Sequence, residues 1–523
     1  MTEQRNEKTA LSRRSVLGVA AALGAGGALT AALPAGAAEP PAPGGPPAGG
    51  TGRAGRDGPA GGAGRAGRDG PARGAGPAGR AGSGGSGGVG ALEGAIDTAA
   101  RRLDADLIAL RRDIHAHPEL AGGESRTSAL VAARLRAAGL AVTTGVGGHG
   151  VVAVLQGTAS PGEDGPRRGA GAGAGRGDGG AGRGTGAHAS GGDGARRGAG
   201  GGAGRTVAYR ADMDAVPPDS QIHGGPAPAH LCGHDLHTTI GVGVAEVLAR
   251  LRHRVRGRFV FLFQPGEEAL TGARAMIDAG VLERTRPDEI HALHCGPFPV
   301  GGFAVTPGAG LPGLDHCVTT LTGPDAADQA GRLVADVARL GTVTFPEAPA
   351  ELERIVRELQ MPHGPLSRFV FVRAGTRPVF GGVEVRTAYR CWPQERVPEI
   401  RAELRRLAGR YAGSQTTFPP DDPFPAMVCP PRPGRELGRH LSRMLGADRV
   451  TTLHAALPFS GEDFALFLNR VPGTFTFLGV RRPGAELSTA YPHFGAFDPD
   501  ERAIGAGVRA MAGWLAHRAT AAQ

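Results

Sequence analysis

The sequence predicts an α/β protein in which strands carry polar residues to one edge of a sheet and helices cover its faces. Three short apolar runs, at residues 206–212, 258–264 and 290–294, each end in or beside carboxylate or imidazole side chains. A helical spacing of apolar residues follows the polar stretch at 228–237. Open α/β sheets place their sites where strands end, so these runs predict one sheet with a site at its edge.

The stretch 228–237 concentrates side chains that bind metals. It contains Cys232, His230, His234 and His237 within a few residues of one another. Cysteine and histidine are ligands for Zn, Mn, Co or Ni, and the Cys-x-His spacing puts two donors on one turn. Taken alone, the stretch could also be a polar loop with a buried cysteine, because it lacks a Cys-x-x-Cys pair. The carboxylate and histidine side chains that follow the nearby apolar runs favour the metal site.

Carboxylates follow the two strands on either side of this stretch. Asp212 and Asp214 end the first apolar run, the adjacent pair Glu267 and Glu268 follows the second, and His294 ends the third. Adjacent glutamates are ordinarily a solvated turn. After a buried strand and beside thiol and imidazole donors, one carboxylate can bind a metal while the other moves protons. This set of side chains predicts a metal-dependent hydrolase.

Seven short motifs between residues 111 and 501 carry a resemblance to a known family. They are Arg111–Leu120, Arg210–Pro217, His230–His237, Gln264–Glu268, Gly461–Phe464, Val471–Gly473, and His493 with Phe497 and Glu501. With them the chain resembles the M20 metallopeptidase and amidohydrolase family, in the branch of N-acyl-amino-acid amidohydrolases similar to hippurate and auxin-conjugate hydrolases. The resemblance implies a metallopeptidase-type catalytic domain, with a mixed sheet flanked by helices, and a smaller inserted α+β lid domain.

The resemblance also implies the roles of the site residues. Two divalent ions of unknown identity would be held by five ligands: Cys232, His234, Glu268, His294 and His493. Glu267 would be the general base, which takes a proton from the attacking water and returns it to the leaving amine.

Further polar residues would support these ligands. Three carboxylates would orient the imidazoles: Asp212, Asp214 and Asp235. Three more histidines, for which a structural role is equally consistent with the sequence, could do the same: His115, His230 and His237.

The predicted lid, residues 314–424, departs from the family in two places. In the family a Gly-rich turn carries a histidine that contacts the scissile carbonyl, whereas Leu321–Ala327 contains none. The asparagine expected before an Ile-Pro pair is also absent around Arg377–Phe380. These changes affect substrate recognition, oxyanion stabilisation and the homodimer that the family often forms through its lid. The predicted metal ligands are all present.

The amino terminus, residues 1–38, predicts a twin-arginine signal peptide. Arg13 and Arg14 precede an apolar run rich in alanine and glycine, and residues 35–37 form a small-residue cleavage site. A membrane anchor is the alternative, but the run ends at a cleavable site. We therefore expect export by the twin-arginine route to the cell envelope or the medium, with no stable membrane anchor after cleavage.

Two glycine-rich tracts flank and interrupt the predicted catalytic domain, whose parts are residues 92–313 and 425–523. In the first tract, residues 39–91, glycine occupies every third position from Gly49 to Gly85 except Arg73. That period is collagen-like, but the tract is short, interrupted and poor in proline, which favours a flexible linker. The second tract, 158–205, has a similar composition and predicts a disordered surface loop.

Charge and cysteine content narrow the possible partners. The net charge of +9 comes mostly from residues 1–38, 39–91 and 158–205, which contribute +2, +3 and +3. The globular remainder is close to neutral, so nucleic-acid binding has little support. Five cysteines leave an odd thiol in an exported protein, and Cys232 as a metal ligand accounts for one.

Three functions are consistent with the sequence. The first is a secreted, dinuclear, metal-dependent amidohydrolase that cleaves N-acyl amino acids or small peptides. The second is an M20-fold protein whose altered lid binds a ligand or hydrolyses a different amide slowly. The third is an adhesive surface protein led by its glycine-rich arms. Glu267 separates the first two, because binding alone needs no base beside the ligating Glu268, and trimerisation of residues 39–91 would favour the third.

Overall fold

The computed structural model describes residues 87–159 and 204–520. The predicted signal peptide, the first glycine-rich tract up to residue 86, and residues 160–203 of the second tract lie outside the described residues. Helix α2 (Gly87–Arg101) begins a few residues before the predicted end of the first tract.

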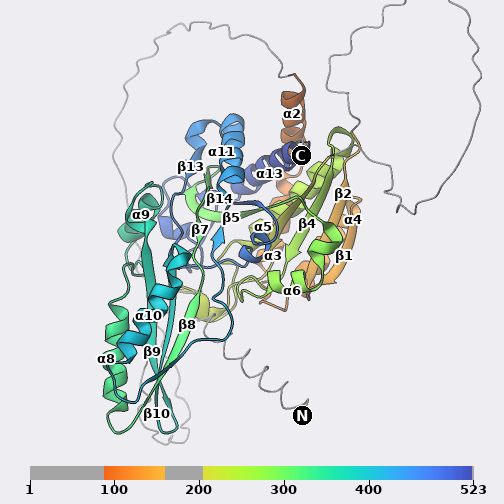
Figure 1. Ribbon diagram of the computed structural model, residues 1–523. Helices are drawn as coiled ribbons and strands as arrows, with labels where there is room; N and C mark the ends of the chain where they lie inside the picture. Colours follow the sequence, from red (N-terminus) through yellow and green to blue (C-terminus); the bar gives the residue numbers. More distant parts are fainter. Residues whose placement is uncertain (1–86, 160–203, 521–523) are drawn as a thin grey trace, which may run out of the picture. The chain divides into compact units, whose positions relative to one another are not determined.

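An eight-stranded mixed sheet forms the larger domain, with strand order β1-β2-β4-β3-β5-β14-β6-β13 (Figure 1). The strands are β1 (Ala141–Val146), β2 (Gly150–Gln156), β3 (Thr206–Asp212), β4 (Arg258–Gln264), β5 (Glu289–Pro299), β6 (Phe303–Val305), β13 (Val450–Thr452) and β14 (Gly473–Arg481). The three predicted apolar runs are β3, β4 and β5, and β3 pairs in parallel with both of its neighbours. Their carboxyl ends therefore meet at one edge of the sheet, as predicted.

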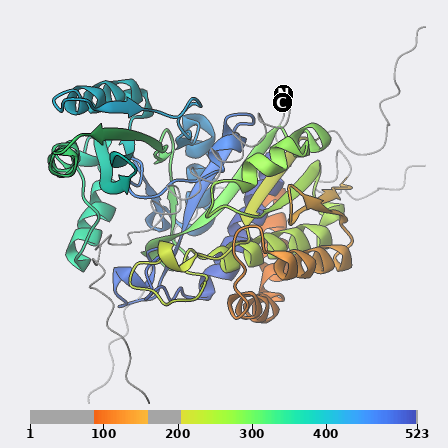
Figure 2. The same ribbon diagram turned by 90° about the horizontal axis from the view of Figure 1, so that it is seen from below.

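Helices cover both faces of this sheet. On one face lie α2, α3 (Asp104–His115), α4 (Ser125–Ala137), α5 (His234–Arg250), α11 (Pro431–Leu445) and α13 (Arg502–Thr520). On the other lie the shorter helices α6 (Gly272–Asp278), α7 (Val281–Thr285) and α12 (Ala465–Leu468). Figure 2 shows α2 to α4, in orange, on one side of the sheet. Helix α5 is buried along its length because apolar residues occur on all its sides and α3 and α13 pack over it.

The smaller domain is the predicted α+β lid. Its four-stranded antiparallel sheet has the order β11-β8-β10-β9. The elements are β8 (Asp315–Thr322), α8 (Ala326–Ala338), β9 (Phe369–Val379), β10 (Gly382–Trp392), α10 (Val397–Ala408) and β11 (Gln415–Thr417). Leu321, Leu333, Val385 and Leu404 are among the buried residues of its own core. The chain enters and leaves the lid through the pair β7 (Gly310–Leu311) and β12 (Met427–Val428).

Helix α9 (Pro349–Glu358) lies within the predicted lid sequence but does not join the lid core. Its buried face, Leu352, Ile355 and Val356, belongs to the same apolar cluster as Leu457 and Tyr491 of the larger domain. The apolar residues of this segment repeat at helical spacing. That spacing could not show which domain the apolar face would pack against, because both domains offer an apolar surface.

Within residues 87–159 and 204–520, no helix combines the length and the hydropathy needed to cross a membrane.

Candidate metal centre

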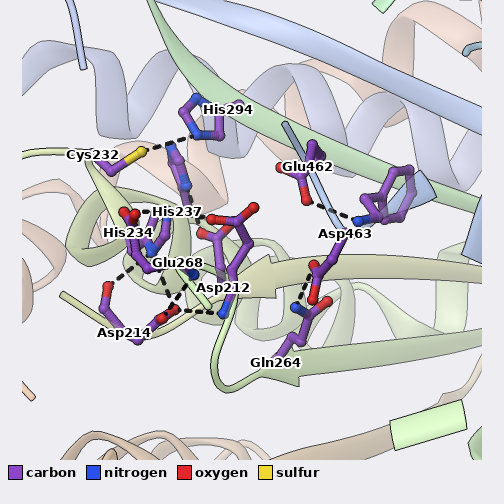
Figure 3. Close-up of polar contacts among 12 residues, drawn as sticks. Asp212, Asp214, Cys232, His234, His237, Gln264, Glu268, His294, Glu462 and Asp463 are labelled. Atoms are coloured by element: carbon purple, nitrogen blue, oxygen red, sulfur yellow. Dashed lines mark hydrogen bonds and ion pairs between the residues drawn. The ribbon is translucent and has the colours of Figure 1, made fainter. Parts of the chain in front are cut away.

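The predicted ligands converge at the carboxyl edge of the large sheet, and Figure 3 shows four of them there, Cys232, His234, Glu268 and His294. Asp212 is the last residue of β3, and Glu267 and Glu268 follow the end of β4. His294 lies on β5, and Cys232 and His234 lie at the amino end of α5. His493 comes from the loop between β14 and α13. Segments far apart in the sequence thus supply one site.

Three of the histidines present a free ring nitrogen toward the centre of the site. The Nδ1 atoms of His234, His294 and His493 lie 2.8, 2.8 and 3.1 Å from the backbone carbonyl oxygens of Asp214, Cys295 and Ser220. A carbonyl oxygen can only accept, so each Nδ1 carries the proton and donates it. In the neutral imidazole each Nε2 then keeps a lone pair, which is how backbone carbonyls fix the tautomer of metal-binding histidines. Burial alone would lower the pKa of His234, but the carboxylates around it raise that pKa to about 10, so a cation there would have to displace a proton from Nε2.

The free donor atoms form two groups that share one thiol. The ligand atoms of Cys232, His234 and His294 lie within 4.8 Å of one another, and so do those of Cys232, Glu268 and His493. Cys232 Sγ is 3.4 Å from His294 Nε2, and Glu268 Oε2 is 3.5 Å from His493 Nε2. Two buried atoms among them, His234 Nε2 and Glu268 Oε1, have no hydrogen-bond partner among the described residues.

The chemistry of this donor set fits two divalent cations. A buried polar atom without a partner costs free energy, and a cation at each group would supply the missing partners. Burial raises the pKa of the Cys232 thiol well above its ordinary value, and burial also raises the pKa of Glu268. A divalent ion favours the thiolate and the carboxylate, because it interacts only with the charged forms.

Gly233 lets the two donors that flank it reach the site. Its φ of 87° lies in the left-handed region, and a Cβ there would lie 2.6 Å from Cys295 Sγ. Any other residue would meet both a backbone penalty and a clash. The Cys-Gly-His spacing is therefore a requirement of the local geometry.

His237 cannot be a ligand, although it lies beside the site. Its Nε2 accepts the backbone N–H of Cys295 at 2.8 Å, so its proton is on Nδ1, which donates to Asp212 at 2.6 Å. Both ring nitrogens are used. The cluster of Asp212, His234 and His237, which also brings three donors together, therefore lacks a free imidazole nitrogen at His237.

The other two predicted supporting aspartates hold different parts of the site. The Asp214 carboxylate accepts the backbone N–H groups of Glu267 and Glu268, at 3.1 and 2.9 Å, and so fixes the turn that carries both glutamates. Asp235 contacts Arg111 and His115, each at 2.8 Å. Asp214 reaches His234 mainly through its backbone, and Asp235 orients His115, which lies outside both donor groups.

His230 is buried without a hydrogen-bond partner for either ring nitrogen among the described residues. Burial lowers its pKa to about 4. It belongs to neither donor group.

Glu267 lies between the donor groups and a buried ionic network. Its Oε2 is 3.7 Å from His234 Nε2. Behind it, Arg210 pairs with Asp212 and donates to Glu462 at 3.0 Å and to Asp463 at 3.1 Å. Burial, reinforced by Glu462 and Glu268, raises the pKa of Glu267 well above its ordinary value. A carboxylate oxygen of Glu267 lies within 4.8 Å of the ligand atoms of His234 and Glu268, one from each donor group, and also of those of Glu462 and Asp463, but Glu267 belongs to neither group that contains Cys232.

A pocket opens over these residues and is walled partly by the lid. Apolar side chains line it on several sides: Leu270, Leu311, Leu457, Phe475 and Phe477. Polar residues at its inner end include Glu267, Glu462, Tyr491 and Arg390. Arg390, on β10 of the lid, is 2% exposed and has no carboxylate partner among the described residues. Its Nε has no hydrogen-bond partner there, and one terminal nitrogen donates to the backbone carbonyls of Pro312 and Gly313, both at 3.4 Å.

The sequence did not identify Arg390 or the role of Arg210. Both are arginines in strands, and nothing in the pattern distinguishes a buried arginine from an exposed one. The acidic pair Glu462 and Asp463 was noticed only as part of a motif. That these arginines and carboxylates are buried becomes visible only in the structure.

Comparison with known proteins identifies the sequence relatives of this fold. The sequence description of peptidase family M20/M25/M40 matches residues 208–517. N-acetylcysteine deacetylase of Bacillus subtilis is 27% identical over 76% of this chain and 93% of its own length. N-acetyldiaminopimelate deacetylase of Lacticaseibacillus paracasei is 27% identical over 60% of this chain and 82% of its own length.

A solved structure has the same fold. A dinuclear metal-binding peptidase of the M20 family from Bacillus subtilis superposes with a TM-score of 0.56 at 24% identity. The match covers 80% of this chain and 99% of that one.

Proposed function

Because the chain belongs to peptidase family M20/M25/M40 and is a metal-dependent hydrolase of amide bonds, we propose that it releases amino acids from N-acyl amino acids. The deacetylases among its relatives act on acylated amino acids by name. The observation that carries the proposal is Arg390, a buried guanidinium without a carboxylate partner among the described residues, in the pocket that also holds the metal donors.

We assign five residues as metal ligands: Cys232, His234, Glu268, His294 and His493. Cys232 would be shared by the two ions, with His234 and His294 on one and Glu268 and His493 on the other. The support is the tautomer of each histidine and the two donor groups with their unpartnered atoms. Bound divalent ions would supply Lewis acidity toward the amide carbonyl and the attacking water.

Glu267 would move the proton. It lines the pocket, follows directly on the turn fixed by Asp214, and lies beside both donor groups without completing either. A carboxylate in that place can accept the proton of the attacking water and deliver it to the leaving nitrogen. Glu267 also lies within 4.8 Å of Glu462 and Asp463, whose charges Arg210 offsets.

Arg390 would bind the free carboxylate of the amino acid. Burial lowers its pKa to about 10, so it remains a cation at neutral pH. A buried cation without an anion is costly, and a planar guanidinium matches a carboxylate with two parallel hydrogen bonds. The apolar walls of the pocket would then contact the acyl group and the side chain.

A comparison of matched substrates tests this proposal. The metal-loaded protein is assayed on N-acyl amino acids and on the same compounds with an amidated carboxyl group. We expect kcat/KM to be about 10-fold to 100-fold higher for the free acids, since hydrogen bonds to charged groups contribute about 1.5–3 kcal/mol. Equal rates for acids and amides would contradict the role of Arg390, and no hydrolysis of either would contradict the substrate class.

The altered lid supports one alternative. The turn between β8 and α8 contains no histidine, so the family's lid contact to the scissile carbonyl has no equivalent there. A protein that binds ligand tightly or hydrolyses a different amide slowly would have the same metal donors. It would show saturable binding of N-acyl amino acids without release of the amino acid.

We also propose export and a homodimer. The motif at Arg13 and Arg14 supports the twin-arginine route, and replacement of both by lysine should abolish export of a fused reporter. The resemblance of the lid supports dimerisation, which light scattering on the purified protein would test.

A further inference from the structure

The loop that carries His493 is held against the lid by aromatic side chains. Phe494, the next residue, has its ring centroid 6.3 Å from that of Phe345 in a stacked arrangement. Phe345 also contacts Phe459, at 5.1 Å, and Phe459 in turn contacts Phe371 of β9, at 5.1 Å. Phe345 and Phe371 belong to the lid sequence, whereas Phe459 and Phe494 belong to the larger domain.

Helix α9 extends this contact along the same loop. It packs against the short helix Leu487–Thr489, which lies just before His493 in the sequence. At the residue that directly follows α9, the carbonyl of Leu359 accepts the backbone N–H of His454 at 2.8 Å. The segment from Phe345 to Leu359 therefore bridges the lid and the His493 loop.

His493 has a backbone conformation that needs outside support. Its φ of 70° lies in the left-handed region, which is uncommon for a residue other than glycine. Such conformations persist only where the surroundings impose them. On one side, His493 N–H donates to Leu231 and its carbonyl accepts from Ile222, both at 2.8 Å. On the other side, Gly495 N–H donates to the Ile222 carbonyl at 2.8 Å, and the Phe494 ring contacts Tyr491 and stacks on Phe345. Of these, the stack on Phe345 is the contact that comes from the lid sequence.

The other donor group has no such dependence on the lid. His234 begins α5 and His294 lies within β5, both in the core of the larger domain. His294 packs against Phe475 and Phe477 of that same domain. The two donor groups thus differ in what holds them: one is built on the sheet and α5, and the other includes a loop that the lid supports.

We infer that Phe345 is a positioning residue for His493, so that docking of the lid completes the Cys232–Glu268–His493 ligand set. The Cys232–His234–His294 set forms without the lid. This inference rests on the proposed function, because it requires His493 to be a metal ligand. The affinity for only one of the two ions then depends on Phe345, a lid residue that does not contact the metal.

The test is a titration of the metal-free, full-length protein with Zn²⁺, followed by calorimetry, with bound zinc counted after gel filtration. We expect Phe345→Ala to weaken one of two binding steps by about 10-fold to 100-fold, the usual effect of a residue that orients a metal ligand. The affected step should be the one that His493→Ala abolishes. Phe345→Tyr keeps the ring and should restore both steps, and Phe345→Leu should fall between.

Phe418→Ala is the matched control. Phe418 is also partly buried, but it packs on the lid core and lies over Arg401 and Arg405. It should leave both steps unchanged. Unchanged Zn²⁺ binding in Phe345→Ala, or equal weakening of both steps in Phe345→Ala and Phe418→Ala, would overturn the inference. Retention of two ions by His493→Ala would instead contradict the ligand assignment in the proposed function.

Discussion

Replacement of Arg390 by methionine should lower activity and raise stability at the same time. Arg390 is buried, and its pKa of about 10 lies below the ordinary value of 12.5. Burial therefore disfavours its charged form in the folded state by about 3 kcal/mol. Because the folded pKa is the lower one, this cost is present in full below pH 10, where the group is protonated in both states, and disappears only above its ordinary pKa.

Methionine fills a similar volume without a charge. The free energy of unfolding at neutral pH should therefore rise by about 1–3 kcal/mol, as when apolar side chains replace buried charges. Meanwhile kcat/KM for N-acyl amino acids should fall by about 10-fold to 100-fold, while the amidated analogues should be hydrolysed at the parent rate.

Arg210 provides the matched control for this experiment. It is also a fully buried arginine on a strand, but it pairs with Asp212, Glu462 and Asp463. Arg210→Met leaves those carboxylates buried without a cation and should destabilise the protein by about 3–5 kcal/mol. Chemical denaturation measures both variants. A loss of stability in Arg390→Met comparable to that in Arg210→Met, or an equal loss of activity on acids and amides, would refute the account of Arg390.

Three further changes test other parts of the structure. Glu267→Gln should retain its metal content by mass spectrometry but lose activity by about 10²-fold to 10⁴-fold, because the amide cannot accept a proton; turnover at the parent rate would exclude the proposed base. His440 is buried, which lowers its pKa to about 3, so the unfolded state binds a proton below pH 6.5 that the folded state does not. Stability should fall by a few kcal/mol between pH 6.5 and 3, and His440→Leu should flatten the pH profile of the melting temperature; the same slope in both proteins would exclude His440 as its cause. Deletion of residues 160–203 with a short turn should change the melting temperature and activity little, because Gly157 N–H donates to Gly257 O at 2.9 Å and Gly204 also lies against Gly257. A large drop would show that the deleted segment packs on the domain.

The sequence predicted those elements whose pattern of apolar residues matches their burial in the folded protein. The runs that became β3, β4 and β5 are continuous stretches of apolar residues, as strands buried on both faces require. Polar residues directly after such strands have to lie at the edge of the sheet. Helix α5 was predicted for a similar reason, since apolar residues repeat at helical spacing after the polar stretch 228–237.

The remaining features depend on contacts between distant segments. His234 and His237 are histidines of the same motif. The backbone N–H of Cys295 donates to Nε2 of His237, whereas Nε2 of His234 has no hydrogen-bond partner among the described residues. Arg390 has a charge that normally indicates exposure, and only the packing of the lid over the pocket buries it. Helix α9 has an apolar face, but the attachment of that face to the larger domain depends on the surface that includes Phe459 and Phe494.

The central claim is that one thiolate, Cys232, is shared by two metal ions. Anomalous X-ray diffraction from crystals soaked in Zn²⁺ measures this directly. Our account predicts two zinc peaks, each about 2.3 Å from Cys232 Sγ, one also coordinated by His234 and His294 and the other by Glu268 and His493. A single zinc peak, or two peaks of which only one contacts Cys232, would contradict it.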